Sequence, residues 1–452
     1  MSVSDPLVGL KTSLLEKHSQ ASGFLIAVSG GLDSVCLLHF LVELSKNTSC
    51  PPIRALHINH GLHKNADRWA RHVEALCADF DIPFISAKVV VSEDEKRRLG
   101  TEAAARECRY QVFEQYLNSN EVLMLAQHGD DQVETLLLRM LRGAGVAGLQ
   151  AMPLQRKLGL GWLYRPFLEL SKSHLKKYAK DNELVWCEDP SNQDVQFDRN
   201  YLRHKIIPSL YKRWPSLPGQ VSSMTKVMQE TQSLLEELGA SDLQQILTPN
   251  ASGLQVSIKA LRSLSRSRQN NVLRYWFSQN SVPMPSYMSL NHIHADFLQS
   301  AVDAQPQLAM GGWSLRRNGQ CLVLIKDSQE SHEPVAFCSL LIDAESLLSG
   351  HIKLPHGALI AAYDHGLGIA LKEGDVLEQR ARQGGERCKP IGRAHSQSLK
   401  KLLQEAKVPA WERANVPLFF VNGELAMVGN LWVNSGFSPS TNQPIWSFSQ
   451  DC

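Results

Sequence analysis

The stretch FLIAVSGGLDSVCLLHFL, from Phe24 to Leu41, constrains the fold more than any other part of the chain. Its first apolar run is typical of a strand buried on both faces, and the apolar run after the turn favours a helix. The glycines between them let the backbone turn tightly and point N–H groups at an anion, and the helix N-terminus adds to this attraction. The sequence therefore predicts a phosphate-binding turn, the phosphate turn, made of Ser29, Gly30, Gly31, Leu32, Asp33 and Ser34.

Asp33 stands where phosphate oxygens would lie, and the turn lacks the lysine of the common phosphate-binding loop. A carboxylate repels phosphate unless a cation such as Mg²⁺ lies between them. We therefore predict a nucleotide site in which Asp33 is a Mg²⁺ ligand. The simpler alternative is that Asp33 only caps the helix that follows.

Strands and helices alternate over the first part of the chain. Strand-like apolar runs begin at residues 24, 53, 82 and 121, and helical stretches cover 34–45, 66–80, 101–117 and 131–141. This order predicts an α/β fold with a parallel, doubly wound sheet. Ligands of such sheets bind beyond the carboxyl ends of the strands, where the polar clusters SGGLDS, HGLH and HGDDQ stand.

The rest of the chain predicts further domains. With 452 residues the chain is long enough for two or three domains. The prolines and glycine of IIPSLYKRWPSLPG suggest a first boundary, and the polar joint DSQESHEP a second. We expect a catalytic domain over 1–215, a linker helix with a mostly helical middle domain over 216–330, and a small α+β domain over 331–452.

Composition limits the partners and the compartment. Net charge is only +2, so any nucleic-acid surface must be local, and no apolar run is long enough to span a bilayer. The nine cysteines show no CxxC and no zinc spacing, and the first residues lack the pattern of a secretory signal. These features predict a cytoplasmic protein with no membrane partner.

Two clusters of charged residues follow predicted strands or lie on predicted helices. Asp130, Asp131 and Glu134 stand with His128 in HGDDQVET, and a metal or a cationic substrate would balance these acids. Arg106, Arg109 and Tyr110 of TEAAARECRYQVF share one helical face. Helix capping and a solvated helix face are the alternative explanations of the two clusters.

Basic residues predict contacts with RNA. Between Trp186 and Lys205, aromatic and basic side chains interleave, as in segments that stack on bases and hold phosphates. Near a glycine turn of the last domain, further cations suit contact with backbone phosphates. The candidates are Arg199, Arg203, Lys205, Arg382, Arg387 and Lys389; a docked helix and a solvated charge run are the alternatives.

These motifs together resemble a known family. SGGLDS matches the signature of the N-type, or PP-loop, ATP pyrophosphatases. With HGL, EAAARECRY, DDQVET, LRGAGVAGL, EDPSN and the later RQGGER, nearly the whole chain resembles the tRNA(Ile)-lysidine synthase family in its long form with two extra C-terminal domains. Asn59, His63 and Gln127 depart from the family's pattern.

The resemblance implies a reaction and roles for residues. It implies ATP-dependent ligation of L-lysine to C2 of the wobble cytidine of tRNA(Ile) with a CAU anticodon, through an adenylated cytidine, with ATP and Mg²⁺ required. The phosphate turn and His60 would bind ATP, and Asp33 and Asp131 would bind the metal. The catalytic candidates are Asp33, Arg106, Asp130, Asp131 and Glu134. The oligomeric state stays open, with a homodimer among the options.

Three rival functions share some of these features. A tRNA thiolase has the same loop but needs a suitable cysteine pair or cluster, which the sequence lacks. An amide-forming ATP pyrophosphatase acting on a small molecule has no use for the basic domains. A non-catalytic RNA-binding protein would not need Asp33, Asp131 and Glu134 intact.

Overall fold

The computed structural model describes residues 6–59, 61, 65–248, 255–301, 304–327, 335–355, 357–362, 367–406, 408–409, 411–438 and 444–449. The chain divides into two compact units, Met1–Leu235 and Glu236–Cys452. The predicted limits of the three domains stay predictions. No helix within the described ranges is both long and apolar enough to cross a membrane.

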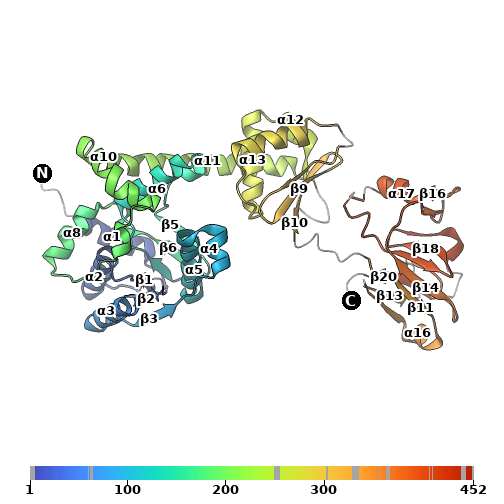
Figure 1. Ribbon diagram of the computed structural model, residues 1–452, viewed down its shortest axis with the longest axis horizontal. Helices are drawn as coiled ribbons and strands as arrows, with labels where there is room; N and C mark the ends of the chain where they lie inside the picture. The colour runs from blue at the N-terminus through green and yellow to red at the C-terminus, as the bar shows by residue number, and fades with distance from the viewer. Residues whose placement is uncertain are drawn as a thin grey trace. The chain divides into compact units, whose positions relative to one another are not determined.

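A six-stranded sheet organises the first unit (Figure 1). Its strand order is β3-β2-β1-β4-β6-β5, and all neighbours are parallel except β5 and β6. The strands are β1 (Phe24–Ala27), β2 (Ile53–Asn59), β3 (Phe84–Lys88), β4 (Val122–Met124), β5 (Gln155–Leu158) and β6 (Gly161–Tyr164). The predicted doubly wound α/β fold is confirmed.

Helices cover both faces of this sheet. One core includes buried side chains of α1 (Pro6–His18), α2 (Leu32–Asn47), α3 (Ala66–Asp79) and α8 (Lys172–Asp181). The core on the other face includes Phe113 of α5 (Thr101–Tyr116). α2 buries ten of its sixteen residues, whereas the exposed side of α3 is polar.

Further helices lie between and after the strands of the sheet, and the last of them continues past Leu235 into the second unit. They are α4 (Glu93–Leu99), α6 (Gly129–Leu141), α7 (Val146–Leu149), α9 (Asp198–Tyr201), the π-helical η3 (Leu202–Ile206), α10 (Ile207–Arg213) and α11 (Leu217–Ile246). Two short 3₁₀ turns are η1 (Pro166–Glu169) and η2 (Pro190–Gln193). Val133 and Leu136 of α6 bury themselves against Leu202, Ile207 and Val221, so the start of α11 shares a core with α6.

The second unit begins with a part that combines helices with a sheet of order β7-β10-β9-β8. The helices are α12 (Ile258–Ser263), α13 (Arg266–Gln279), α14 (Tyr287–His292) and the π-helical η4 (Ile293–Leu298). The strands are β7 (Gln255–Ser257), β8 (Gln307–Ala309), β9 (Trp313–Asn318) and β10 (Cys321–Lys326), and their described pairings are antiparallel.

Antiparallel sheets form the last part of the chain. A five-stranded sheet contains β11 (Cys338–Leu341), β14 (Val376–Arg380), β17 (Leu418–Val421), β18 (Glu424–Val428) and β19 (Trp432–Val433). The smaller sheets contain β12 (His351–Leu354), β13 (Gly357–Ala362) and β20 (Ile445–Ser449), and β15 (Arg387–Cys388) with β16 (Gln397–Ser398). The helical elements are α16 (Ala344–Ser349), α17 (Leu399–Glu405) and the 3₁₀ turn η5 (Ser435–Phe437).

Candidate active site

The phosphate turn joins β1 to α2 and is held by its own hydroxyls. Ser34 Oγ donates to the Gly31 carbonyl at 2.9 Å and lies 3.1 Å from Ser29 Oγ. The backbone N–H of Ser29 donates to Ser34 Oγ at 3.2 Å. Gly30 has a φ of +88°, and a Cβ there would lie only 3.1 Å from Val73 of α3. A side chain at Gly30 would therefore be strained and crowded.

A distant segment closes over this turn. The backbone N–H of Cys187 donates to the Gly30 carbonyl at 2.8 Å. Cys187 belongs to the stretch Trp186–Arg203, which we call the EDPSN segment. The hydrogen bond brings the phosphate turn and the EDPSN segment, two separate motifs of the sequence, into one site.

His128 stands at the centre of the predicted acids. Its Nε2 lies 3.5 Å from Asp33 Oδ2 and 3.5 Å from Asp131 Oδ2, and its Nδ1 lies 3.7 Å from Asp130 Oδ2. Burial lowers the pKa of His128, but the carboxylates of Asp131, Asp33 and Asp130 raise it more, so the pKa is raised overall. His128 was not among the predicted site residues, although its place at the end of β4 beside two aspartates was visible.

The three acids after β4 have different surroundings. Asp130 accepts from the backbone N–H of Lys172 at 2.7 Å and from the Tyr211 hydroxyl at 3.0 Å, so it ties α6 to α8 and α10. Asp131 lines a pocket at the end of the sheet. Glu134 is buried, with only 2% of its surface exposed.

Two arginines of the EDPSN segment bind these acids. Arg199 Nε lies 2.7 Å from Glu134 Oε2, and Arg203 Nε lies 2.6 Å from Glu134 Oε1. Asp131 Oδ1 lies 3.0 Å from Arg199 and 3.4 Å from Arg203. Burial raises the pKa of Asp131, but the positive charges of His128, Arg199 and Arg203 outweigh this and lower it overall.

These ion pairs concern the tRNA contacts that were predicted for Arg199 and Arg203. Arg199 and Arg203 were expected to contact tRNA; in the structure they lie on the acids and also line the pocket. Their contact with tRNA stays a prediction, and so does the part of Glu134 in catalysis. The spacing of these residues along the chain gave no indication that they form ion pairs.

The residues around Asp33 suit a divalent cation. Asp33 Oδ1 is buried without a hydrogen-bond partner, and carboxylate oxygens are the ligands that Mg²⁺ prefers. In the part of the chain that is described, no group of three or more metal-ligating side chains is gathered around one point. The free oxygen of Asp33 therefore fits an ion whose remaining ligands are phosphate oxygens and water. Asp131 lies on His128, Arg199 and Arg203, and its role as a metal ligand stays a prediction.

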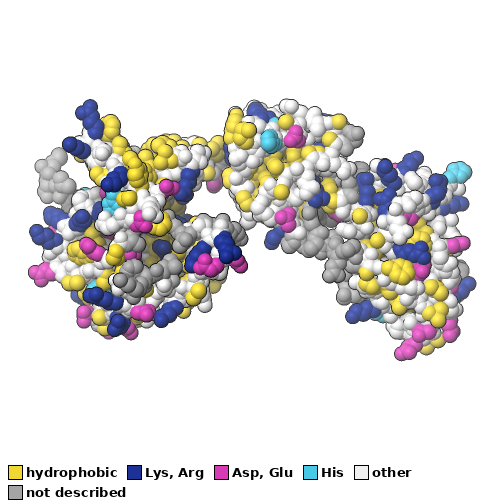
Figure 2. All heavy atoms as spheres, in the orientation of Figure 1, with side chains coloured by type: hydrophobic (Ala, Val, Ile, Leu, Met, Phe, Trp, Pro, Cys, Tyr) yellow, Lys and Arg dark blue, Asp and Glu magenta, His cyan; other side chains and the backbone are white. Residues whose placement is uncertain are grey.

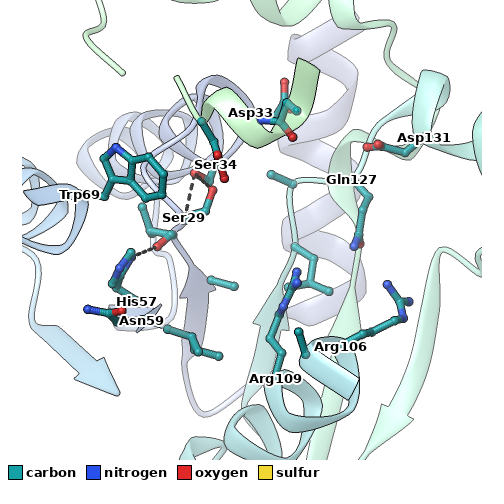
Figure 3. Close-up of a pocket in the computed structure, with 18 of the residues that line it drawn as sticks. Ser29, Asp33, Ser34, His57, Asn59, Trp69, Arg106, Arg109, Gln127 and Asp131 are labelled. Atoms are coloured by element: carbon teal, nitrogen blue, oxygen red, sulfur yellow. Dashed lines mark hydrogen bonds between the residues drawn. The ribbon is translucent and has the colours of Figure 1, made fainter. Parts of the chain in front are cut away.

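A pocket of about 810 Å³ opens beside these groups. Figure 3 shows Asp33 and Asp131 toward one end of it and Arg106 and Arg109 toward the other. The pocket also touches His57, Asn59, Trp69 and Phe113, which were not candidate site residues, and Asp189 and Phe197 of the EDPSN segment. The polar residues at the end of β2 could be expected from the rule that ligands bind beyond the carboxyl ends of parallel strands, and Asp189 lies in the EDPSN motif. Trp69 had no such signal in the sequence.

The end of β2 forms one wall of the pocket. Burial lowers the pKa of His57, whose Nδ1 lies 2.9 Å from the Val28 carbonyl. Asn59 donates to Asp67 at 2.9 Å and accepts from the backbone N–H of Gly61. Asn59, a departure from the family pattern, thus shapes the turn after β2. His60, predicted to bind ATP, lies outside the described residues.

Arg106 reaches the pocket from α5. Its guanidinium lies 5.1 Å from the centre of the Tyr110 ring and donates to the Tyr110 hydroxyl at 3.4 Å. Gln127, the other departure at the site, accepts from the buried Arg165 at 2.7 Å. The catalytic role of Arg106 stays a prediction.

The remaining RNA candidates are not among the residues that line the pocket. Lys205, Arg387 and Lys389 are exposed, and Arg382 Nε lies 3.7 Å from Glu386. On the face drawn in Figure 2, Lys and Arg side chains gather over the α17 and β16 part of the last domain. Contact of these residues with tRNA stays a prediction.

Comparison with known proteins assigns all three parts of the chain. Three family models match: a PP-loop domain over residues 8–210, the TilS substrate binding domain over 257–323, and the TilS substrate C-terminal domain over 377–449. The tRNA(Ile)-lysidine synthase of Coxiella burnetii is 39% identical over 94% of this chain and 92% of its own length. Those of Pseudomonas fluorescens and Pectobacterium atrosepticum are each 37% identical, over 95% and 99% of this chain and 94% and 98% of their own lengths.

The matched motifs lie together in the structure, because the phosphate turn, Asp131 after β4 and the EDPSN segment all contribute to one pocket. The chain therefore belongs to the tRNA(Ile)-lysidine synthase family.

Proposed function

We propose that this protein ligates L-lysine to C2 of the wobble cytidine of tRNA(Ile) with a CAU anticodon. ATP first adenylates the C2 carbonyl oxygen and releases pyrophosphate. The ε-amine of lysine then attacks C2, and AMP leaves. The observation that carries the proposal is that one pocket is lined by the phosphate turn, by Asp131 and by the EDPSN segment.

The phosphate turn would hold the leaving pyrophosphate. Its backbone N–H groups, the hydroxyls of Ser29 and Ser34 and the N-terminus of α2 all favour an anion. Asp33 would hold Mg²⁺, which supplies positive charge to the phosphates when bound. Arg106 is our candidate for stabilising negative charge on the phosphates or on the lysine carboxylate.

The acidic residues would bind the lysine and accept its proton. Attack on C2 needs a neutral amine, so a group in the site must take a proton from the lysine ammonium. Asp131 and Asp189 are our candidates for binding that ammonium, because both line the pocket. Glu134 would act through Arg199 and Arg203, whose guanidiniums it shares with Asp131.

The test is incubation with ATP, Mg²⁺, labelled lysine and a tRNA(Ile) transcript with a CAU anticodon, followed by analysis of the nucleosides. We expect lysidine, with one AMP and one pyrophosphate formed for each lysine incorporated. A methionine tRNA with the same anticodon is the matched control. Sustained pyrophosphate release without lysine, or incorporation of sulfur, would contradict the proposal. The proposal implies a cytoplasmic location, where tRNA, ATP and lysine meet.

A further inference from the structure

Tyr110 is surrounded by three arginines, which together we call the guanidinium cluster: Arg106, Arg156 and Arg165. The guanidinium carbons of Arg106 and Arg156 lie 5.1 Å and 4.9 Å from the centre of the Tyr110 ring. The Tyr110 hydroxyl accepts from Arg106 at 3.4 Å and from Arg165 at 3.5 Å. Side chains from α5, from β5 and from the end of β6 therefore meet at one phenol.

Arg165 is held rigidly behind this phenol. Only 2% of its surface is exposed, and it donates to Gln127 and to the Pro153 carbonyl, each at 2.7 Å. Arg106 and Tyr110 line the pocket, whereas Arg156 is half-buried on the edge strand β5. The cluster thus reaches from the pocket wall to the edge of the sheet.

The cluster carries positive charge without a matching acid. Within the described residues, none of its three arginines lies in an ion pair with a carboxylate. Burial raises the pKa of Tyr110, but the positive charges of Arg106, Arg165 and Arg156 lower it more, so the net pKa is lowered. Three guanidiniums gathered without a counterion favour the arrival of an anion.

The place of the cluster decides which anion it suits. β5 is three strands away from β1, which carries the phosphate turn, and at about 4.8 Å per strand this is about 14 Å. Phosphates seated on the phosphate turn would not extend to Arg156. An RNA strand that inserts one base into the pocket keeps its sugar–phosphate backbone outside, where an edge strand is accessible.

We propose that Arg156, packed against the Tyr110 ring, forms a phosphodiester subsite for the tRNA backbone beside the wobble cytidine, while Arg106 serves the pocket. The proposal rests on the proposed function, since it assigns part of that substrate to a surface of the catalytic unit. Arg156 is a binding residue in this role and does not touch the reacting atoms.

Lys157 provides a matched control one residue away. Successive side chains of a strand point to opposite faces, and Lys157 lies 5.0 Å from the Trp162 ring in the core opposite to that of Tyr110. Arg156→Ala and Lys157→Ala therefore remove the same charge from the same strand but from different faces.

The experiment measures binding of a tRNA(Ile) transcript with a CAU anticodon to the full chain by anisotropy at several salt concentrations. For Arg156→Ala we expect affinity to fall about fivefold to tenfold near 0.1 M salt, and the slope of log affinity against log salt to become shallower by about one. Lys157→Ala should bind like the wild type, and Arg156→Lys should retain most of the slope. The KM values for ATP and for lysine are measured in parallel.

Equal affinities and equal salt slopes for Arg156→Ala and Lys157→Ala would overturn the proposal. A raised KM for ATP or lysine with unchanged tRNA binding would overturn it too, because the anion would then be a phosphate of ATP or the lysine carboxylate. A change in salt slope for Arg156→Ala but not for Lys157→Ala would support the subsite even if no lysidine formed. The binding test can therefore succeed or fail independently of the proposed function.

Discussion

Asp33 meets a buried histidine through one carboxylate oxygen and leaves the other buried without a hydrogen-bond partner. We expect Asp33→Asn to reduce tRNA-dependent pyrophosphate release at least about a hundredfold, because a metal-held phosphate contributes several kcal/mol to the transition state. Binding of tRNA should change little, since Asp33 lies on the phosphate turn. Pyrophosphate release and anisotropy on the same preparation test both statements, and normal release would refute the first.

The neighbouring acids should respond differently to neutralisation. We expect Asp131→Asn to raise the KM for lysine, because Asp131 lines the pocket. Asp130→Asn and Glu134→Gln should lower lysine incorporation through altered geometry, since Asp130 bonds Lys172 and Tyr211 and Glu134 bonds two arginines. Steady-state kinetics with varied lysine measures this, and unchanged lysine kinetics in all three variants would reject these acids as the lysine site.

Unfolding in urea shows whether a kinetic effect of these substitutions comes from lost stability. Glu134→Gln leaves two partly buried arginines without their carboxylate, so the free energy of unfolding should fall by about 3 kcal/mol. Asp131→Asn should lower it less, because Arg199 and Arg203 keep Glu134.

For single residues, the sequence predicted which side chains belong to the site but not which of them contact each other. The phosphate turn was predictable because a turn, its hydroxyls and its helix are local in the chain. The ion pairs of Arg199 and Arg203 with Glu134 were not, because the EDPSN segment and α6 are far apart in sequence and only the tertiary fold brings them together. Aromatic and basic residues in alternation suggested RNA; the same arginines hold acids in the structure, and their contact with tRNA stays a prediction.

Among the secondary-structure elements, long periodic stretches were predicted best. The expected helices over 34–45, 66–80, 101–117 and 131–141 correspond to α2, α3, α5 and α6. The hairpin β5–β6 was not foreseen, because QRKL and GWLY are short and the first alternates weakly between polar and apolar residues. That hairpin carries Arg156, so part of the proposed RNA subsite had no signal in the sequence.

The contact between helices α13 and η4 predicts that stability depends on pH. Burial, followed by the positive charge of Arg266, lowers the pKa of His294 from 6.5 to about 4, and its Nε2 lies 2.8 Å from Asn270 Oδ1. The unfolded chain therefore takes up a proton at a higher pH than the folded chain does. Stability from neutral His294 is present above pH 6.5 and is lost as the pH falls toward 4, by about 3 kcal/mol at most.

Hydrogen-exchange protection of α13, corrected for the intrinsic rates, should fall between pH 7 and pH 4.5 in the wild type. In His294→Gln the same protection should depend less on pH, because the amide cannot gain a proton. An equal pH dependence in both proteins would show that another group titrates.

For the whole molecule, the place of the cut decides what a truncation tests. A chain ending near residue 215 would lose Leu217 and Val221, which belong to the core around α6, whereas a chain ending at Leu235 keeps the first compact unit. We expect this longer fragment to bind ATP, because its sheet and pocket are complete. It should lose most tRNA affinity and show a shallower salt slope, since phosphate contacts spread over the later domains supply much of binding.

Titration of ATP and of tRNA at several salt concentrations compares the fragment with the full chain. Equal tRNA affinities and slopes would show that the second unit does not hold tRNA.

The basic residues of the last domain allow a milder version of the same experiment. Replacing Arg382, Arg387 and Lys389 together with alanine should move the full chain partway toward the behaviour of the fragment, with little change in ATP binding. Arg387 and Lys389 are exposed, so folding should be retained. Lys11 and Lys17 of α1, with Lys46 of α2, offer a triple substitution of equal charge far from the last domain in sequence. Equal losses in the two triple variants would point to net charge rather than to a surface.

The hydrogen bond from Cys187 to Gly30 also sets an order of events during synthesis. The ribosome makes the phosphate turn early, but the amide that closes it and the two arginines that hold the acids emerge only after the whole sheet has been made. A growing chain therefore contains the phosphate turn before it contains the residues that complete the active site. Translation itself should keep unfinished enzyme from consuming ATP, and stalled chains ending before Cys187 should release no pyrophosphate above background.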